Sequence, residues 1–195
     1  MTFVYEDKKS EFWNNYWDQA LSLDAFIEGT KPDEKEQWND RKSRVPDLEA
    51  DQVERLSGFD RQLNVLMYAG GYCGDCSRQA PMLLKMAEVA GEKVNLRVIE
   101  REGLTELQDE LRVLGALRVP IVVFLTEDYW EVGRFGERLL SVYRSKAARE
   151  IGRGKDQGVL SPKALKRETT EWLDIFERML LMVQLAPPLR RRYND

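Results

Sequence analysis

The segment Tyr72-Cys73-Gly74-Asp75-Cys76-Ser77-Arg78-Gln79-Ala80-Pro81 decides the fold of this chain of 195 residues. It holds the only two cysteines of the sequence, three positions apart. The apolar run at residues 63–69 precedes it, ends at Gly70-Gly71, and predicts a buried strand followed by a turn. From Cys73 to Ala90, apolar side chains recur at helical spacing, and Gly91 ends the pattern. The sequence therefore predicts a strand, a turn and a helix, with the cysteine pair at the start of the helix.

Further strands and helices follow this unit along the chain. Residues 94–99 and 120–126 predict two more strands, and residues 129–135 predict a fourth that pairs with the third across a short turn. Between the second and third strands, leucines recur at helical intervals, namely Leu104, Leu107, Leu111 and Leu114. We expect the early crossovers to give parallel strands and the short last connection to give an antiparallel pair. The predicted fold class is α/β, a mixed four-stranded sheet flanked by helices, with helical extensions at both ends.

The chain divides into three predicted parts within one globular unit. Residues 1–61 form an N-terminal helical extension that packs on the core, residues 62–150 form the core, and residues 151–195 form a linker and a C-terminal helix. That last helix is predicted to start at Ser161-Pro162, a serine cap followed by proline at the first helical position, and to run to about Leu185.

The N-terminal extension contains three predicted segments. Residues 10–28 predict one helix with an aromatic stripe, which we expect to face the core, the alternative being a docking groove for clients. Residues 31–44 are highly charged and predict a loop or an exposed helix, and Pro46-Asp47 predicts the start of a short helix.

The two cysteines have the spacing of a dithiol that exchanges with disulfides. At a helix N-terminus, free backbone N–H groups and the helix dipole stabilise a thiolate and lower the pKa of a cysteine. Cys73 is therefore the predicted nucleophile and Cys76, on the inward side, the resolving thiol. The carboxylate of Asp75 is predicted to oppose this effect by raising the pKa of Cys73, which makes the disulfide harder to reduce and favours a reductant.

The quoted segment resembles the active-site segment of the thioredoxin family: an aromatic residue, then C-G-x-C, then a proline five residues after the second cysteine. Arg118-Val119-Pro120, followed by the apolar run Ile121–Phe124, resembles the cis-proline loop of that family, and Gly133 matches its glycine near the end of the last strand. The resemblance covers about residues 62–150. It implies a thioredoxin-like fold and a redox-active Cys73–Cys76 disulfide.

The resemblance also implies roles for the neighbours of the cysteines. Pro120 is expected to be cis and to lie beside the disulfide, and the backbone of Val119 is expected to pair with an extended client segment. Tyr72, Gly74 and Asp75 are expected to bind the substrate or to tune the redox couple. Pro81 is expected to have a structural role inside the helix.

Three positions depart from the family pattern. Tyr72 stands where the family usually has tryptophan, and Asp75 stands where it has proline. Met67 occupies the position of a buried aspartate that, in the family, helps to deprotonate the resolving thiol. Asp75 and Glu100 are the candidates for replacing that carboxylate. We therefore expect an atypical member of the family.

Composition limits the other chemistry. The chain has no histidine and a formal net charge of −4, so histidine-dependent catalysis is excluded and no partnership with nucleic acid or a membrane surface is expected. No signal peptide or membrane-spanning run is visible, and the expected location is cytoplasmic. No metal and no cofactor beyond the cysteine pair is expected. Because the chain lacks a G-x-G-x-x-G loop, its electron donor is expected to be another protein or a small thiol.

The expected activity is reduction or exchange of disulfides in a client protein or small molecule. Two other interpretations stay open. The groove and the added helices can make a binding module with little turnover, or two chains can share a metal or an iron–sulfur cluster through four thiolates.

Overall fold

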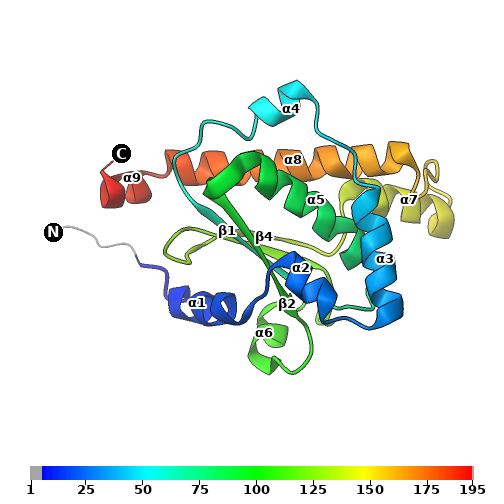
Figure 1. The fold of residues 1–195 in the computed structure, drawn as a ribbon, viewed down its shortest axis with the longest axis horizontal. Helices are drawn as coiled ribbons and strands as arrows, with labels where there is room; N and C mark the ends of the chain where they lie inside the picture. Colours follow the sequence, from blue (N-terminus) through cyan, green and yellow to red (C-terminus); the bar gives the residue numbers. More distant parts are fainter. Residues whose placement is uncertain (1–5, 195) are drawn as a thin grey trace.

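A four-stranded sheet in the order β2-β1-β3-β4 forms the centre of the computed structural model, which describes residues 6–194 (Figure 1). β1 pairs with β2 in parallel and with β3 in antiparallel orientation, and β3 pairs with β4 in antiparallel orientation. The sheet is therefore mixed, as predicted. Its strands are β1 (Leu63–Ala69), β2 (Val94–Glu100), β3 (Ile121–Leu125) and β4 (Glu131–Gly136).

The direction of β3 corrects the prediction, because only the first crossover gives a parallel pair. The connection after β2 contains α6 (Thr105–Glu110), a helix of six residues that is about 9 Å long. The 20 residues of the connection, 101–120, do not run back along the sheet. Ile121 pairs with Tyr68 near the end of β1, and Ala69 pairs with Glu100, so the chain enters β3 at the end of the sheet where β2 leaves it. α6 also ends earlier than the leucine spacing indicated, and Leu114 lies fully exposed with a positive φ of 51°.

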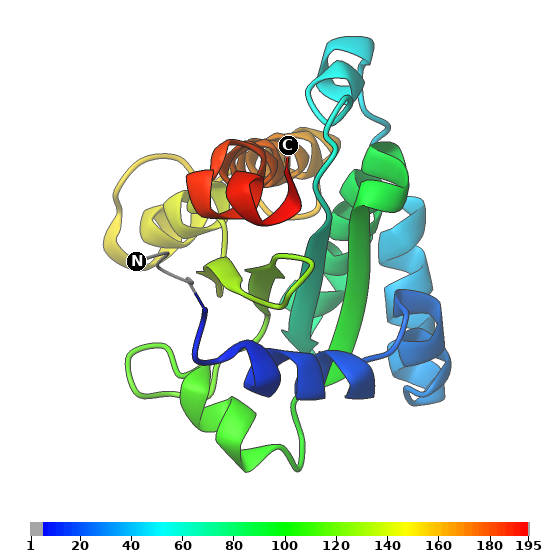
Figure 2. The same ribbon diagram turned by 90° about the vertical axis from the view of Figure 1, so that its left-hand side faces the viewer.

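The two faces of the sheet have separate apolar cores, because successive side chains of a strand point to opposite faces. Val65 and Met67 of β1 pack with α5 (Gly74–Ala90) and α8 (Pro162–Leu185). Leu66 and Tyr68 pack on the other face with α1 (Ser10–Gln19) and α6. Figure 2 shows these layers, with α1 and α6 on one side of the strands and α5 and α8 on the other.

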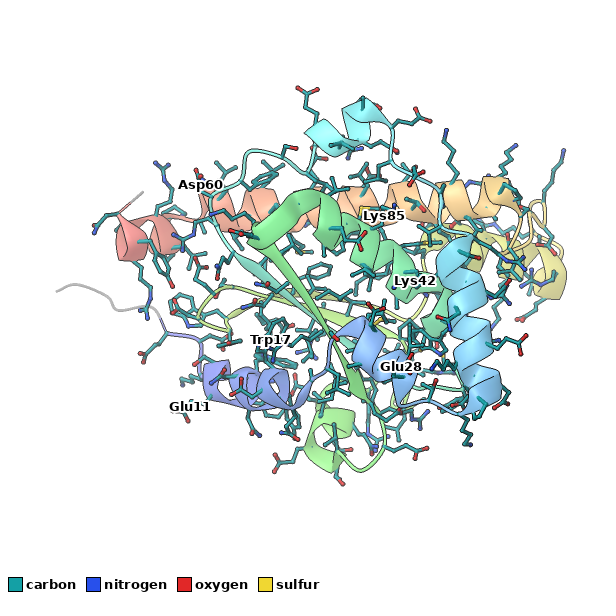
Figure 3. All side chains as sticks on the ribbon, in the orientation of Figure 1. Glu11, Trp17, Glu28, Lys42, Asp60 and Lys85 are labelled. Atoms are coloured by element: carbon teal, nitrogen blue, oxygen red, sulfur yellow. The ribbon has the colours of Figure 1, made fainter. Side chains whose placement is uncertain are left out.

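The predicted helix over residues 10–28 is two helices, α1 and α2 (Leu23–Glu28). They separate because Leu21 is extended and forms a β-bridge with Val98 of β2, after which Ser22 caps α2 by accepting a hydrogen bond from the Ala25 N–H. The aromatic stripe faces the core, as expected: Trp13, Tyr16 and Trp17 are buried. In Figure 3, Trp17 points from α1 toward the sheet, whereas Glu11 points away from it.

The charged segment that follows is a helix with one inward side chain. α3 (Pro32–Ser43) packs along α5, and its Trp38 is completely buried. The next helix, α4 (Ala50–Glu54), starts later than Pro46-Asp47 indicated, because Glu49 makes a capping box with Gln52. A 3-10 turn at Gly91–Lys93 follows α5, where Gly91 has the positive φ of a helix stop.

The C-terminal part lies against the same face as α5. After β4 come α7 (Leu140–Ile151) and then α8, which starts with the predicted Ser161 cap. Gly133 of β4 lets α8 approach the sheet, because a Cβ there would lie 3.2 Å from the Met179 side chain. A last helix, α9 (Pro187–Tyr193), begins with two consecutive prolines and was not predicted. No helix among residues 6–194 is both long and apolar enough to cross a membrane.

Candidate functional site

Cys73 lies at the N-terminal end of α5, where it is the cap residue. Its Sγ accepts a hydrogen bond from the backbone N–H of Cys76, with a distance of 3.2 Å between Sγ and N. The side chain is partly exposed, so a substrate can reach the sulfur. This is the geometry in which free N–H groups of a first helical turn stabilise a thiolate.

The pKa of Cys73 is lowered, as its position predicts. The largest cause is the hydrogen bond from the Cys76 side chain, and the Cys76 N–H adds to it. Burial and the negative charge of Asp75 act in the opposite direction. Asp75 therefore has the predicted effect on the pKa of Cys73, but the helix start and the second cysteine outweigh it.

Cys76 is one turn further along α5 and is completely buried. Burial raises the pKa of its thiol well above the ordinary value, and the nearby sulfur of Cys73 raises it further. The two cysteines thus have different ionisation properties. Cys73 is the one prepared to react as a thiolate, and Cys76 keeps its proton until another group takes it.

The loop before β3 lies against the cysteine pair. The Val119–Pro120 peptide bond is cis, and the Cys73 thiol lies 3.8 Å from the carbonyl oxygen of Val119, to which it can donate a weak hydrogen bond. Pro120 is buried and Val119 is half-buried. The structure therefore brings together the two segments that the sequence resemblance linked, although they are 46 positions apart in the chain.

The turn between β1 and α5 is held from two sides. Trp38 of α3 donates a hydrogen bond from its indole Nε1 to the carbonyl oxygen of Gly71, over 2.8 Å. A carboxylate oxygen of Glu100, at the end of β2, accepts from the Gly71 N–H over 3.3 Å. A Cβ at Gly71 would lie 2.9 Å from a carboxylate oxygen of Glu34 and 3.0 Å from the methyl group of Thr30, so a larger residue there would displace these side chains. The next residue, Tyr72, is exposed, and its hydroxyl accepts a hydrogen bond from Arg101.

Asp75 does not act as an isolated charge. One carboxylate oxygen lies 2.8 Å from a guanidinium nitrogen of Arg78, and the other accepts from Nε of Arg138 over 2.8 Å. Arg78 is on α5 and is buried, whereas Arg138 follows β4. The guanidinium groups of Arg78 and Arg138 therefore offset the negative charge of Asp75. The motif alone does not reveal this feature.

Arg78 also contacts a buried carboxylate. Its Nε donates to Oε2 of Glu168 over 3.1 Å, and Glu168 is only 1% exposed. Burial raises the pKa of Glu168 to about 7, although Arg78 counteracts this by lowering it. The other oxygen, Oε1, is buried with no hydrogen-bond partner among the described residues. Glu168 belongs to α8, so the C-terminal extension contributes directly to the surroundings of the motif.

The other residues that the sequence analysis singled out lie on α5, β1 and β2. Gly74 is the exposed first residue of α5, and Pro81 is buried inside that helix. Met67 is buried in β1. Of the two candidates to replace the family's aspartate, Glu100 bonds to the backbone of the turn and Asp75 bonds to arginines, so the structure gives both carboxylates other partners.

Several side chains around the motif were missed by the sequence analysis. They are Trp38, Arg78, Arg138 and Glu168. A lone tryptophan in a charged stretch was a usable sign of Trp38, because large aromatic side chains are usually buried. The charged residues gave no such sign, since most arginines and glutamates are exposed.

Comparisons with known proteins agree with this geometry. A family model described as Thioredoxin matches residues 20–146, so the match begins before Gln62 and ends before α8. The crystal structure of an HIV epitope-scaffold is 22% identical, with a TM-score of 0.63, over 85% of this chain and 97% of that one. A crystal structure of a protein of unknown function from Pseudomonas aeruginosa is also 22% identical, with a TM-score of 0.56, over 86% of this chain and 92% of that one. Both likenesses concern the fold alone. The curated proteins contain no match to this chain.

Proposed function

Because the chain belongs to the thioredoxin family, we propose that it exchanges electrons with disulfides through Cys73 and Cys76. The observation that carries this proposal is the pair itself: a partly exposed sulfur at a helix N-terminus, bonded to the N–H of a second, buried cysteine. A thiolate at the first position can attack, and a thiol at the second is close enough to resolve the product.

The exchange follows from the two ionisation states. The Cys73 thiolate attacks one sulfur of a client disulfide, forms a mixed disulfide, and releases the other sulfur as a thiolate that takes up a proton. Cys76 then loses its proton and attacks the Cys73 sulfur, which releases the second client thiol. Two electrons pass to the client, and the chain is left with a Cys73–Cys76 disulfide.

We infer that reduction of client disulfides is the favoured direction. The helix start and Cys76 lower the pKa of Cys73, but burial and Asp75 act against this, and burial keeps Cys76 protonated, so these groups limit the stabilisation of the dithiol form. A dithiol form without strong stabilisation donates its electrons readily. The client is a protein or a small molecule with a disulfide, and a second protein or a small thiol returns the cysteine pair to the dithiol state.

The test uses the resolving cysteine. A Cys76→Ser variant, incubated with insulin or with glutathione disulfide, should accumulate a mixed disulfide through Cys73, visible by mass spectrometry of the intact protein. The matched Cys73→Ser variant should trap none. If Cys76→Ser also traps none and the wild type does not reduce insulin, the chain is a binding module or a shared metal site rather than an exchange enzyme. Metal analysis of the purified protein separates those two outcomes.

A further inference from the structure

A row of charged side chains with alternating sign runs past the cysteine motif. It starts beside the cis-proline loop and ends inside the C-terminal extension. The separations between neighbouring nitrogen and oxygen atoms are as follows: Arg118–Glu137 3.9 Å, Glu137–Arg138 2.5 Å, Arg138–Asp75 2.8 Å, Asp75–Arg78 2.8 Å and Arg78–Glu168 3.1 Å. Asp75, one of the two residues between the cysteines, lies within this row.

The inner end of the row differs from its outer end. The side chain of Arg118 is 51% exposed, so water screens its charge. Glu168 is 1% exposed and Arg78 is 5% exposed, so their interaction is screened little. One carboxylate oxygen of Glu168 bonds to Arg78, and the other is buried with no hydrogen-bond partner among residues 6–194. An incompletely compensated carboxylate in such a place takes up a proton readily.

We propose that Glu168 is a positioning residue that sets the redox balance of Cys73 and Cys76 by acting through Arg78 and Asp75. This inference rests on the dithiol–disulfide cycle proposed above, and it assigns a role to α8, which lies outside residues 20–146 of the family match. Glu168 does not touch the sulfurs. Its charge determines how strongly the guanidinium of Arg78 offsets the negative charge of Asp75.

The direction of the effect follows from charge. When Glu168 is protonated, Arg78 faces Asp75 alone and offsets its negative charge. When Glu168 is ionised, the same guanidinium is shared between two carboxylates, and the surroundings of Cys73 become more negative. A more negative environment disfavours the Cys73 thiolate, so the disulfide becomes harder to reduce.

The change in the charge of Glu168 falls in the neutral pH range, because its pKa is about 7. The charged groups that act on Glu168 are Arg78 and Asp75 from α5 and Glu171 from its own helix. Glu137, Arg138 and the hydroxyl of Tyr143, from the β4–α7 connection and α7, complete the surroundings of Asp75. Because its pKa is about 7, Glu168 changes its charge within the pH range of the test.

The test is equilibration of the cysteine pair with glutathione in Glu168→Gln and in the wild type, at about pH 6 and about pH 8. Glutamine keeps the shape and can still accept from Arg78. At the higher pH, the variant should favour the dithiol about threefold more than the wild type, which corresponds to about 14 mV for a two-electron couple. At the lower pH, where Glu168 is protonated, the two proteins should agree. Glu177→Gln is the matched control, because Glu177 is on the same helix and pairs with Arg55 instead. A ratio that is unchanged at both pH values, or shifted equally at both, overturns the proposal.

A second measurement needs no variant. If Glu168 acts on the cysteines, then oxidation of the cysteines must shift the titration midpoint of Glu168, because linkage is reciprocal. Carboxyl 13C shifts of the wild type should give a lower midpoint for Glu168 in the disulfide form than in the dithiol form. Identical midpoints overturn the proposal. Since chemical oxidation of the cysteines suffices, this result stands even if the chain fails to trap or reduce a client.

Discussion

Trp38 and Glu168 come from opposite flanks of the chain, and both reach the segment that carries the cysteines. Trp38, on α3, holds the turn before Cys73 with one hydrogen bond from a neutral indole to the Gly71 carbonyl oxygen. Glu168, on α8, reaches the motif through the ion pairs of Arg78. The hydrogen bond of Trp38 is independent of pH, whereas the carboxyl group of Glu168 changes its charge near pH 7.

This difference shows how two helices from opposite flanks of the chain can act on the cysteine motif in separate ways. A neutral hydrogen bond fixes the position of the backbone and contributes to stability at every pH. A buried carboxylate is costly unless a cation compensates it, but its charge can respond to the protons around it. We therefore expect substitutions at Trp38 to change stability equally at every pH. Substitutions along the Glu168 row should change stability in a pH-dependent way and should also change the chemistry of Cys73.

The largest expected effect is that of Trp38→Ala. It removes a completely buried aromatic side chain that packs edge-on against Phe26, and leaves a cavity between α2, α3 and α5. The free energy of unfolding, measured with urea on the reduced protein, should fall by about 3–5 kcal/mol. The loss should be equal at about pH 6 and about pH 8, because the indole and the carbonyl group carry no charge. A loss under about 1 kcal/mol would contradict the role of Trp38 in the core.

The next effect concerns the pH dependence of stability. The pKa of Glu168 is raised in the folded state from its ordinary value of 4.5 to about 7. The folded state therefore holds this proton more tightly, and its contribution to stability is complete below pH 4.5 and is lost as pH rises toward 7. Glu168 should lower the free energy of unfolding by up to about 3 kcal/mol across that interval.

Urea unfolding of the wild type and of Glu168→Gln over this interval tests the expectation. The difference in unfolding free energy between the two proteins should change with pH and level off above about pH 7.5. The control is again Glu177→Gln, whose carboxylate pairs with Arg55 nearer the surface. Parallel curves for the wild type and Glu168→Gln would show that Glu168 does not titrate in this range.

Trp38→Phe isolates the hydrogen bond from the packing. Phenylalanine keeps most of the apolar contacts but cannot donate to the Gly71 carbonyl oxygen, which is buried. We expect a loss of about 1–2 kcal/mol in unfolding free energy, well below that of Trp38→Ala. The alkylation rate of Cys73 by iodoacetamide should keep the pH dependence of the wild type. A displaced pH profile would show that the turn also controls ionisation, and it would remove the distinction between the two flanks.

Local patterns in the sequence predicted the parts of the molecule that depend on neighbouring residues. The cysteine spacing, the strand before it and the stop at Gly91 placed Cys73 at a helix start, and Ser161 marked the start of α8. The direction of β3 could not be read in the same way. The connection at residues 101–120 is long enough for either direction. The leucine spacing also overstated the length of α6, because Leu114 is exposed in a tight turn.

Charged contacts between distant segments were beyond sequence reasoning for a different reason. Arg78 and Glu168 are 90 positions apart, and each is of a residue type that is usually exposed. Only the fold shows that α8 crosses α5 where the two side chains meet. The sequence predicted the sign of the Asp75 effect on Cys73, but the cations that limit this effect come from tertiary structure.

The smallest expected effect, that of Asp75→Asn, tests whether the two flanks act separately. Removing the carboxylate leaves Arg138 and Arg78 without their shared partner, and the pKa of Cys73 should fall because a negative charge beside the thiolate is lost. Alkylation of Cys73 at about pH 6 should become about threefold to tenfold faster, while Asp47→Asn, which removes a carboxylate paired with Lys85 of α5, should change nothing. Because additivity fails for residues in one network, the effect of Asp75→Asn should add to that of Trp38→Phe but not to that of Glu168→Gln. Full additivity with both variants would mean that Glu168 has no electrostatic effect on Cys73, and that α8 only packs against the sheet.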